Sequence, residues 1–413
     1  MRNNSRYFKA IALLTSGSLL GQIIGFVGSL FMTRLYSEAE IGIMTSIVAV
    51  SGIFGAVING RFDFAIVKEQ DEKMIIPLVA LSLFIGILFS LFVSFFSLFY
   101  FKTLDRFLAP PLASCFVLII LLITAFTNVF RSYNNRVRDY KTMTWVIVFR
   151  RIAEEMSMVI FGLLSLKSIG LLFSRVVGQF FGMRQEIRNI KNRFDEITKV
   201  KWHELSPVFQ RHKRQLYYSA PAALMNSASY SLISLFIGSL FGLDTLGIYA
   251  ISFAVLGLPL SVISSNVSKV YFGEASQEYA NSGTFIDSTK KTFFLLLPIS
   301  LLMWAVMSFI VPPIVPWIYG KGYVEAGTYI RILSPMFAIR FISSSMNTGL
   351  IVANKQNVEV YIQILFVVAI FLSFVIARIR GIDVNSFLLI ISILYSIIYA
   401  INFVYIYRLS NRT

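Results

Sequence analysis

The chain has 413 residues, of which 56% are hydrophobic and 14% are charged, and its mean hydropathy is +0.73. Soluble domains carry about 25% charged residues, so this composition excludes an ordinary soluble protein. A net charge of +16 would suggest a nucleic-acid partner for a soluble protein. In a membrane protein, an excess of basic residues instead indicates which loops face the cytoplasm. We therefore expect no nucleic-acid partner.

Long apolar segments dominate the sequence, and a membrane-spanning helix needs about 20 such residues. We therefore expect an all-α polytopic membrane protein with twelve transmembrane helices. The first segment exceeds the apolar region of a signal peptide and lacks a small-x-small cleavage site, so we expect it to remain as an anchor. The predicted spans are 10–32, 41–58, 74–100, 112–130, 143–164, 168–183, 217–241, 247–272, 292–312, 327–351, 357–377 and 385–407.

The loops between these spans alternate between many and few basic residues. With a cytoplasmic N-terminus, 25 of the 37 Lys and Arg residues fall in inside segments, 7 in outside loops and 5 within spans. Basic residues are enriched in cytoplasmic loops. The sequence therefore predicts that both termini are cytoplasmic and that the inner face attracts anionic lipid headgroups.

The first predicted span carries a stripe of four glycines, Gly17, Gly21, Gly25 and Gly28. Spacings of three and four place them on one helical face, where missing side chains permit close helix packing. Close packing is the favoured interpretation. A surface that bends or slides during transport is the alternative.

Charged residues inside spans are candidate functional residues, because burying them in a bilayer is costly. Arg340 lies in the tenth span with no acid within four residues, so we expect it to face a partner helix or an anion-binding cavity. Arg175 in the sixth span is a second candidate, with a structural bond to a neighbouring helix as the alternative. Arg61, next to Asp63 just beyond the second span, could bind a phosphate or anchor the inner face. Arg331 is expected near the outer interface.

The fifth span contains two Arg and two Glu at a spacing of four: Arg150, Arg151, Glu154 and Glu155. Each Arg can neutralise the Glu one turn later. Self-compensating ion pairs are the favoured interpretation. The alternative is that Glu154 and Glu155 couple transport to a proton or another cation.

A polar stretch between the sixth and seventh spans divides the chain. Within it, Ile187, Ile190, Phe194 and Ile197 recur at helical spacing, which indicates either a helix in the membrane interface or a solvated linker. We therefore predict a six-helix lobe over 1–183, a basic cytoplasmic or interfacial linker over 184–216 and a second six-helix lobe over 217–413.

The two predicted lobes resemble each other. A shift of 205 residues aligns Arg34–Ile43 with Ser239–Ile248, pairing Leu35 with Leu240 and Gly42 with Gly247. Both segments join the first two spans of a lobe and face the same side. A parallel repeat of this kind predicts a transporter with its substrate path between the lobes.

The sequence contains no features of common catalytic or metal sites. It has one cysteine, Cys115, and its two histidines show no metal-ligand spacing, so no metal or cofactor is expected. It has no glycine-rich phosphate loop of the ATPase type. The longest predicted outside loop, 313–326, holds one acid, Glu325, which argues against a glycan polymerase or ligase, so we do not expect an enzyme.

Five short motifs follow one another along the chain: Leu14-Thr-Ser-Gly-Ser-Leu-Leu-Gly-Gln22, Thr33-Arg-Leu-Tyr-Ser37, Gly60-Arg-Phe-Asp-Phe-Ala-Ile-Val67, Leu246-Gly-Ile-Tyr249 and Ile332-Leu-Ser-Pro335. Together they resemble the Wzx-type polysaccharide biosynthesis flippases of the multidrug/oligosaccharidyl-lipid/polysaccharide exporter superfamily. Each motif is short, but their order along the whole chain resembles that of the family. One departure is the run 341–346, where relatives often place a proline.

The resemblance implies two pseudo-symmetric six-helix lobes around a cationic central cavity. It further implies a bacterial cytoplasmic (inner) membrane protein that moves a polyprenyl-diphosphate-linked oligosaccharide, for O-antigen or capsule, to the outer leaflet. Membrane lipids, a glycan polymerase and a chain-length regulator are then possible partners. Two rivals share the fold: a cation-coupled drug or metabolite antiporter, and a peptidoglycan-precursor flippase, whose relatives commonly carry two more spans.

Overall fold

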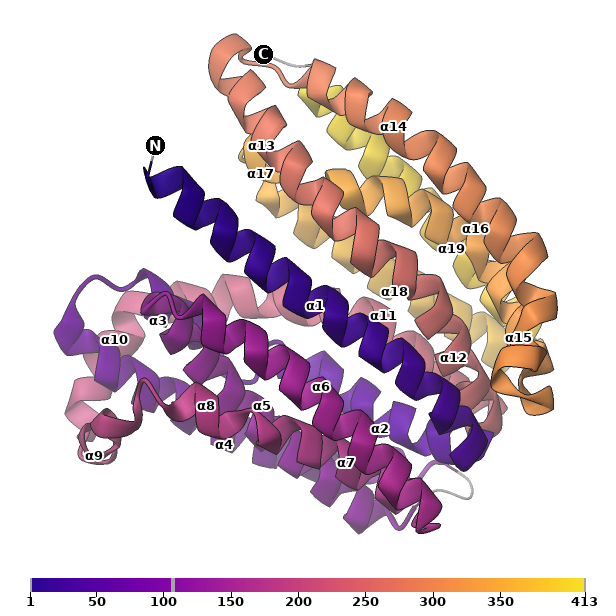
Figure 1. The fold of residues 1–413 in the computed structure, drawn as a ribbon, viewed down its shortest axis with the longest axis horizontal. Helices are drawn as coiled ribbons and strands as arrows, with labels where there is room; N and C mark the ends of the chain where they lie inside the picture. Colours follow the sequence, from indigo (N-terminus) through magenta and orange to yellow (C-terminus); the bar gives the residue numbers. More distant parts are fainter. Residues whose placement is uncertain (1, 105–107, 412–413) are drawn as a thin grey trace. The chain divides into compact units, whose positions relative to one another are not determined.

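All regular elements in the described part of the computed structural model are helices (Figure 1). The structure describes residues 2–104 and 108–411, with side chains from residue 15 onward. The side chains of Arg2, Arg6 and Lys9 and the residues 412–413, which enter the predicted topology, lie outside this part. The α-helices are α1 Arg2–Leu35, α2 Glu38–Gly55, α3 Phe62–Lys68, α4 Glu72–Phe101, α5 Pro110–Arg136, α6 Tyr140–Leu163, α7 Lys167–Phe181, α8 Met183–Ile187, α9 Phe194–Thr198, α10 Trp202–Arg214, α11 Ala220–Phe241, α12 Leu243–Pro259, α13 Ser265–Ser282, α14 Ile286–Ala305, α15 Val311–Tyr319, α16 Val324–Met346, α17 Gly349–Val352, α18 Gln356–Arg380 and α19 Val384–Ser410.

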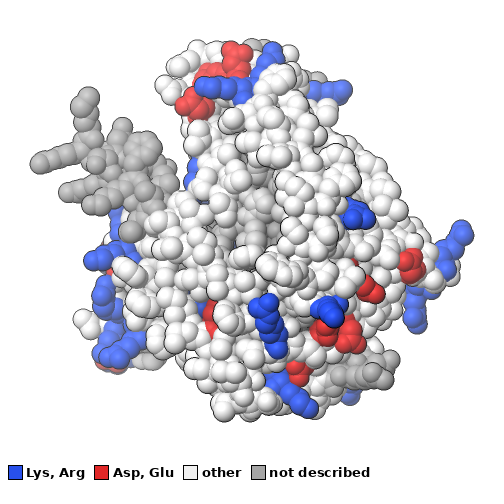
Figure 2. Space-filling model, turned by 45° about the vertical axis from the view of Figure 1, so that its right-hand side comes forward, with Lys and Arg blue, Asp and Glu red and all other residues white. Residues whose placement is uncertain are grey.

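Each predicted span coincides with helical structure, which confirms an all-α polytopic membrane protein. Among the described residues, nine helical stretches are long and apolar enough to cross a bilayer. The helices at the other three predicted spans are α6 and α16, which carry internal charges, and α7, which has 15 residues. The count of twelve crossings therefore stays a prediction. Most of the face drawn in Figure 2 is uncharged, as a lipid-facing surface requires.

The chain forms two compact units, residues 1–231 with 242–244, and residues 232–241 with 245–413. The polar stretch 184–216 belongs to the first unit. Its apolar side chains Ile187, Ile190, Phe194 and Ile197 contact the core that α3, α4 and α5 build. The helical spacing of these four residues thus reflects packing against protein. The lobe boundaries and the interfacial position of this stretch stay predictions.

The glycines of α1 lie against α6, which confirms the predicted close packing (Figure 1). A Cβ atom at Gly17 would lie 2.5 Å from the Thr144 methyl group. A Cβ at Gly25 would overlap the Arg151 guanidinium, and one at Gly28 would overlap the Glu155 carboxylate. Because these glycines have no side chains, the charged side chains of α6 can lie across α1.

The other side of α6 is approached by α7 in the same way. A Cβ at Gly178 would lie 2.6 Å from Glu154 Cβ and 3.0 Å from the Arg150 carbonyl oxygen. Gly182 directly follows α7. A Cβ there would lie 2.6 Å from Val146 Cγ1 and 2.8 Å from Arg150 Cγ. Glycines on two helices therefore enclose the charged segment of α6.

Arg331 satisfies a backbone carbonyl that a proline leaves unpaired. Pro312 has no N–H to donate to the Ser308 carbonyl four residues earlier. The Arg331 Nε–H donates to that carbonyl at 3.1 Å. Pro335 likewise leaves the Arg331 carbonyl without a donor, and the Ser334 hydroxyl donates to it at 3.0 Å. Arg331 therefore has a packing role in addition to any position near the outer interface.

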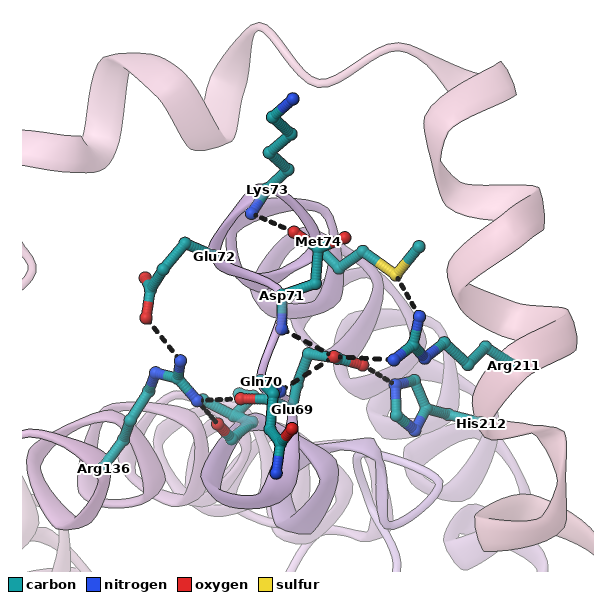
Figure 3. Close-up of polar contacts among 10 residues, drawn as sticks. Glu69, Gln70, Asp71, Glu72, Lys73, Met74, Arg136, Arg211 and His212 are labelled. Atoms are coloured by element: carbon teal, nitrogen blue, oxygen red, sulfur yellow. Dashed lines mark hydrogen bonds and ion pairs between the residues drawn. The ribbon is translucent and has the colours of Figure 1, made fainter.

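Glu69, in the loop between α3 and α4, connects this loop to α10 within the first unit (Figure 3). Its side chain is 1% exposed and accepts hydrogen bonds from the Gln70 and Asp71 N–H groups, both at 2.9 Å. Arg211 and His212 of α10 contact the same carboxylate at 3.1 and 2.8 Å. Burial alone would raise the pKa of Glu69, but these hydrogen bonds and the Arg211 charge together hold it below its usual range.

Arg136 at the end of α5 secures the same loop from the other side (Figure 3). Its guanidinium donates to the Ile66 carbonyl at 3.1 Å, to the Glu69 carbonyl and to the Glu72 carboxylate at 2.5 Å. The loop and both neighbouring helix ends are thereby fixed. Arg61 directly precedes α3, and Asp63 and Phe64 lie in its first turn, at the opposite end of the helix from this loop.

We predict that Gly178→Ala destabilises the protein. The added methyl group meets backbone and Cβ atoms of α6, which cannot move aside as a flexible side chain can, and overpacking of this kind costs about 1–3 kcal/mol. The matched control is Gly257→Ala, because a Cβ there has no atom within 4 Å. Thermal unfolding in detergent should show a lower Tm for Gly178→Ala alone. Equal Tm values would contradict the close α6–α7 contact.

We also predict that Glu69→Gln lowers the stability in a pH-dependent way. A carboxylate whose pKa is depressed on folding stabilises the protein above its unfolded pKa of about 4.5. This stabilisation is lost as pH falls through the lower folded value. The substitution should therefore lower the Tm at pH 7, and the difference should shrink as pH falls below about 4.5. A constant difference across that range would show that charge on Glu69 is not the cause.

Candidate functional site

A polar pocket of about 530 Å³ lies within the first unit. Ligand pockets have volumes of about 300–1,000 Å³, so this one could hold a small group. Residues of α2, α5 and α7 line it, together with the turn and first residues of α3. Its charged lining residues are Arg61, Asp63, Arg131 and Arg175, and Ser51, Thr124, Asn128, Ser132 and Gln179 add neutral polar groups.

Arg61 adopts an unusual backbone conformation that places it at the start of α3. Its φ angle of 64° lies in the left-handed region, which non-glycine residues rarely occupy. The guanidinium lies 3.7 Å from the centre of the Phe64 ring and donates to the Ala56 carbonyl at 3.4 Å. Its buried Nε has no hydrogen-bond partner among the described residues. At least one donor of Arg61 is therefore unused by the described part of the protein.

Asp63 is the acid that lines this pocket. It is 5% exposed, and burial raises its pKa to about 6, although the nearby Arg61 charge and two backbone N–H groups oppose this. Asp63 therefore changes its charge close to physiological pH. The protonated pocket is more positive by one unit.

Arg131 and Arg175 reach the pocket from α5 and α7. Arg131 lies 3.8 Å from Glu186, and its side chain is 44% exposed. Glu186 is buried, which raises its pKa against the opposing charges of Arg131 and Arg150. Arg175 forms an ion pair with Glu154 on α6. Three guanidinium groups and one acid, Asp63, therefore line the pocket. Two further acids, Glu186 and Glu154, contact Arg131 and Arg175 without lining the pocket themselves.

Glu154 links the pocket to a chain of ion pairs on α6. It contacts Arg151 at 3.3 Å as well as Arg175, and Arg151 contacts Glu155 at 2.9 Å. The predicted Arg151–Glu155 pair is therefore confirmed. The predicted Arg150–Glu154 pair is wrong, since no ion pair within 4 Å joins them among the described residues. The close approach of α7 at Gly178 brings Arg175 to Glu154 instead.

The predicted site residues occupy three places. Arg61 and Arg175 share the pocket, while Arg150 and Arg151 lie on α6 with Glu154 and Glu155. Arg340 belongs to the second unit, where its guanidinium lies 5.3 Å from the centre of the Phe337 ring. The functional roles of all these residues stay predictions, as does a cavity between the lobes.

Sequence reasoning missed most of the polar residues that line the pocket, among them Arg131 and Gln179. Arg131 was counted only as a topology signal. It follows Thr124 and Asn128 at helical spacing on α5, and this polar face within an apolar helix could have identified it. Gln179 has a buried Oε1 without a hydrogen-bond partner among the described residues. Such a group has unused capacity to accept a hydrogen bond.

The pocket has the chemistry of an anion-binding site. Guanidinium groups match the geometry of phosphate oxygens and can contact them in a bidentate manner. Within the described residues, no group of three or more His, Cys, Asp or Glu side chains is placed to hold a metal ion.

Solved structures of membrane transporters share this fold. An inward-facing multidrug resistance transporter of the MATE family, in the MOP superfamily, is 12% identical with a TM-score of 0.73, covering 94% of each chain. The lipid II flippase MurJ, in an inward closed conformation, is 14% identical with a TM-score of 0.73, covering 96% of this chain and 86% of its own. A MOP superfamily transporter from Pyrococcus furiosus Vc1 is 12% identical with a TM-score of 0.62, covering 98% and 97%.

A family model provides more specific information than these distant structures. No curated protein sequence matches the chain. The model described as "Polysaccharide biosynthesis protein" matches residues 31–328, a range that includes the whole pocket. This match, over residues 31–328, shows that the chain belongs to the polysaccharide biosynthesis protein family.

Proposed function

We propose that this protein moves a polyprenyl-diphosphate-linked oligosaccharide from the inner to the outer leaflet of a bacterial cytoplasmic membrane by alternating access. The glycan would be a repeat unit of O-antigen, capsule or exopolysaccharide. Both termini would be cytoplasmic. The observation that carries this proposal is the arginine-lined pocket in a member of a polysaccharide biosynthesis family.

The pocket suits the charged part of such a substrate. A diphosphate linking a lipid to a sugar carries two negative charges, and crossing about 30 Å of hydrocarbon is the main barrier to its movement. Arg61 and Arg131 have donors or exposed surface that could replace water around these charges. At about 530 Å³, the pocket accommodates the diphosphate and its first sugar, while longer glycan must extend beyond it.

Neutral polar groups beside the arginines suit the sugar. The unpartnered Gln179 Oε1 can accept a hydrogen bond from a sugar hydroxyl, and Asn128 and Ser132 line the same pocket. Phe64 is 45% exposed, and the part of its ring that Arg61 does not cover could pack against a sugar. A transported glycan then has to be used on the far side, so a glycan polymerase and a chain-length regulator are the expected partners.

A cation-coupled drug or metabolite antiporter is the second candidate. The buried acid Asp63 favours it, because an acid that titrates near neutral pH could exchange a proton for a cationic substrate. The surrounding arginines disfavour it, because they repel cationic drugs. Glu154 and Glu155, the coupling acids suggested by the sequence, are already paired with arginines in this structure.

We predict that the combined substitution Arg61→Gln and Arg131→Gln slows flipping at least tenfold. Each charge-assisted hydrogen bond contributes about 1.5–3 kcal/mol, and 1.4 kcal/mol corresponds to a factor of about ten. Both changes leave the Arg175–Glu154 pair intact. Flipping is measured in proteoliposomes with a fluorescent polyprenyl-diphosphate glycan.

The control variant is Arg380→Gln, an exposed residue at the end of α18 in the second unit. It should flip the lipid at the wild-type rate. Equal rates for the double variant and the wild type would overturn the role of the pocket. Efflux of a cationic dye that depends on a cation gradient, without flipping, would favour the antiporter.

We predict that binding of a diphosphate analogue is pH-dependent through Asp63. As pH falls through about 6, protonation removes a negative charge from the pocket, so affinity should rise. Asp63→Asn should bind at pH 8 as tightly as the wild type does at pH 5 and lose the dependence. Titration calorimetry at both pH values measures this with a soluble diphosphate that is esterified at both ends, as in the lipid-linked substrate, because its charge then stays constant between pH 5 and pH 8. If the affinity of Asp63→Asn still changed with pH, a group other than Asp63 would cause the pH dependence.

A further inference from the structure

A groove on the second unit lies between α14 and α19, and residues of α16 line one part of it. It consists of two adjoining cavities of about 350 and 460 Å³ that share Phe293 and Phe403. The rings of these two residues are stacked, with centroids 4.9 Å apart. The groove is distinct from the arginine-lined pocket, which lies in the first unit.

The groove has a cationic end. The Phe285 N–H donates to the Ser410 carbonyl at 3.0 Å, so the start of α14 and the end of α19 lie side by side. Lys290 and Arg408 line the groove near this junction. Both are exposed, and neither forms an ion pair with another described residue. In the topology proposed above, this end faces the cytoplasmic leaflet.

Away from that end the groove is apolar. It extends along α14 from Lys290 to Trp304, which is about 21 Å at 1.5 Å per residue. One leaflet of the hydrocarbon core is about 15 Å thick, so the groove can take a lipid chain down to the bilayer midplane. Small residues make the space, namely Ala338 on α16 and Ala400 on α19. The Ser300 hydroxyl in its wall already donates to the Ala338 carbonyl at 2.8 Å.

We propose that this groove is a binding site for one anionic phospholipid of the cytoplasmic leaflet. The phosphate group binds Lys290 and Arg408, and one acyl chain lies along Phe293 and Phe403 toward Trp304. The charges match an anionic headgroup, which cytoplasmic leaflets supply. The glycan-bearing carrier lipid fits less well, because its sugars need hydrogen-bonding groups and Tyr407 is the remaining polar side chain at this end.

Native mass spectrometry of the full chain with added phosphatidylglycerol or phosphatidylethanolamine tests the proposal. We expect one phosphatidylglycerol to bind the wild type at least tenfold more tightly than phosphatidylethanolamine. The double variant Lys290→Ala, Arg408→Ala should lose this preference. Ala400→Phe, which fills the groove without changing charge, should weaken binding of both lipids. Thermal unfolding verifies that each variant is folded.

The matched control is Lys291→Ala, which removes a neighbouring exposed charge on α14 outside the groove and should keep the preference. The proposal is overturned if the wild type shows no preference, or if the double variant retains it. It is also overturned if a polyprenyl phosphate displaces phosphatidylglycerol at equal concentration, since the carrier lipid would then be the occupant. None of these outcomes depends on the flipping activity.

Discussion

Charged side chains within apolar helices need both a counter-charge and the space to reach it, and this requirement organises the first unit. On α6, the four charged residues Arg150, Arg151, Glu154 and Glu155 lie within two turns of the helix. Two neighbouring helices present glycines at that level, at Gly25 and Gly28 of α1 and at Gly178 of α7. Without those glycines the helices would be held apart, and an unpaired charge in the interior would be strongly destabilising.

The same requirement shapes the pocket. Arg175 is both a wall of the pocket and a partner of Glu154, so it is fixed in place by α6. Arg131 has Glu186 behind it in a comparable way. Arg61 differs, because stacking on Phe64 and one carbonyl contact leave part of its donor capacity unused. A site with some arginines anchored and one available combines a fixed shape with capacity for an incoming anion.

Much of this could be predicted from the sequence, because hydropathy and helical spacing are local properties of the chain. The helices, the packing face of α1 and the candidate residues Arg61 and Arg175 follow from such patterns. The partner of Arg175 could not be predicted, since Glu154 is 21 residues away and reaches it only through the approach of α7. Glu69 gave no signal either, because its partners Arg211 and His212 follow more than 140 residues later.

The amino-acid sequence by itself determined that the chain is a helical membrane protein with charges in its spans, because a bilayer imposes a minimum apolar length that any sequence must display. It also determined the family resemblance, through short motifs in a conserved order. Only the tertiary structure decided which charges are paired and which remain available to a ligand. The pairing of charges depends on how closely the helices approach one another. Glycines such as Gly178 permit a close approach, but their presence in the sequence does not specify which helices meet.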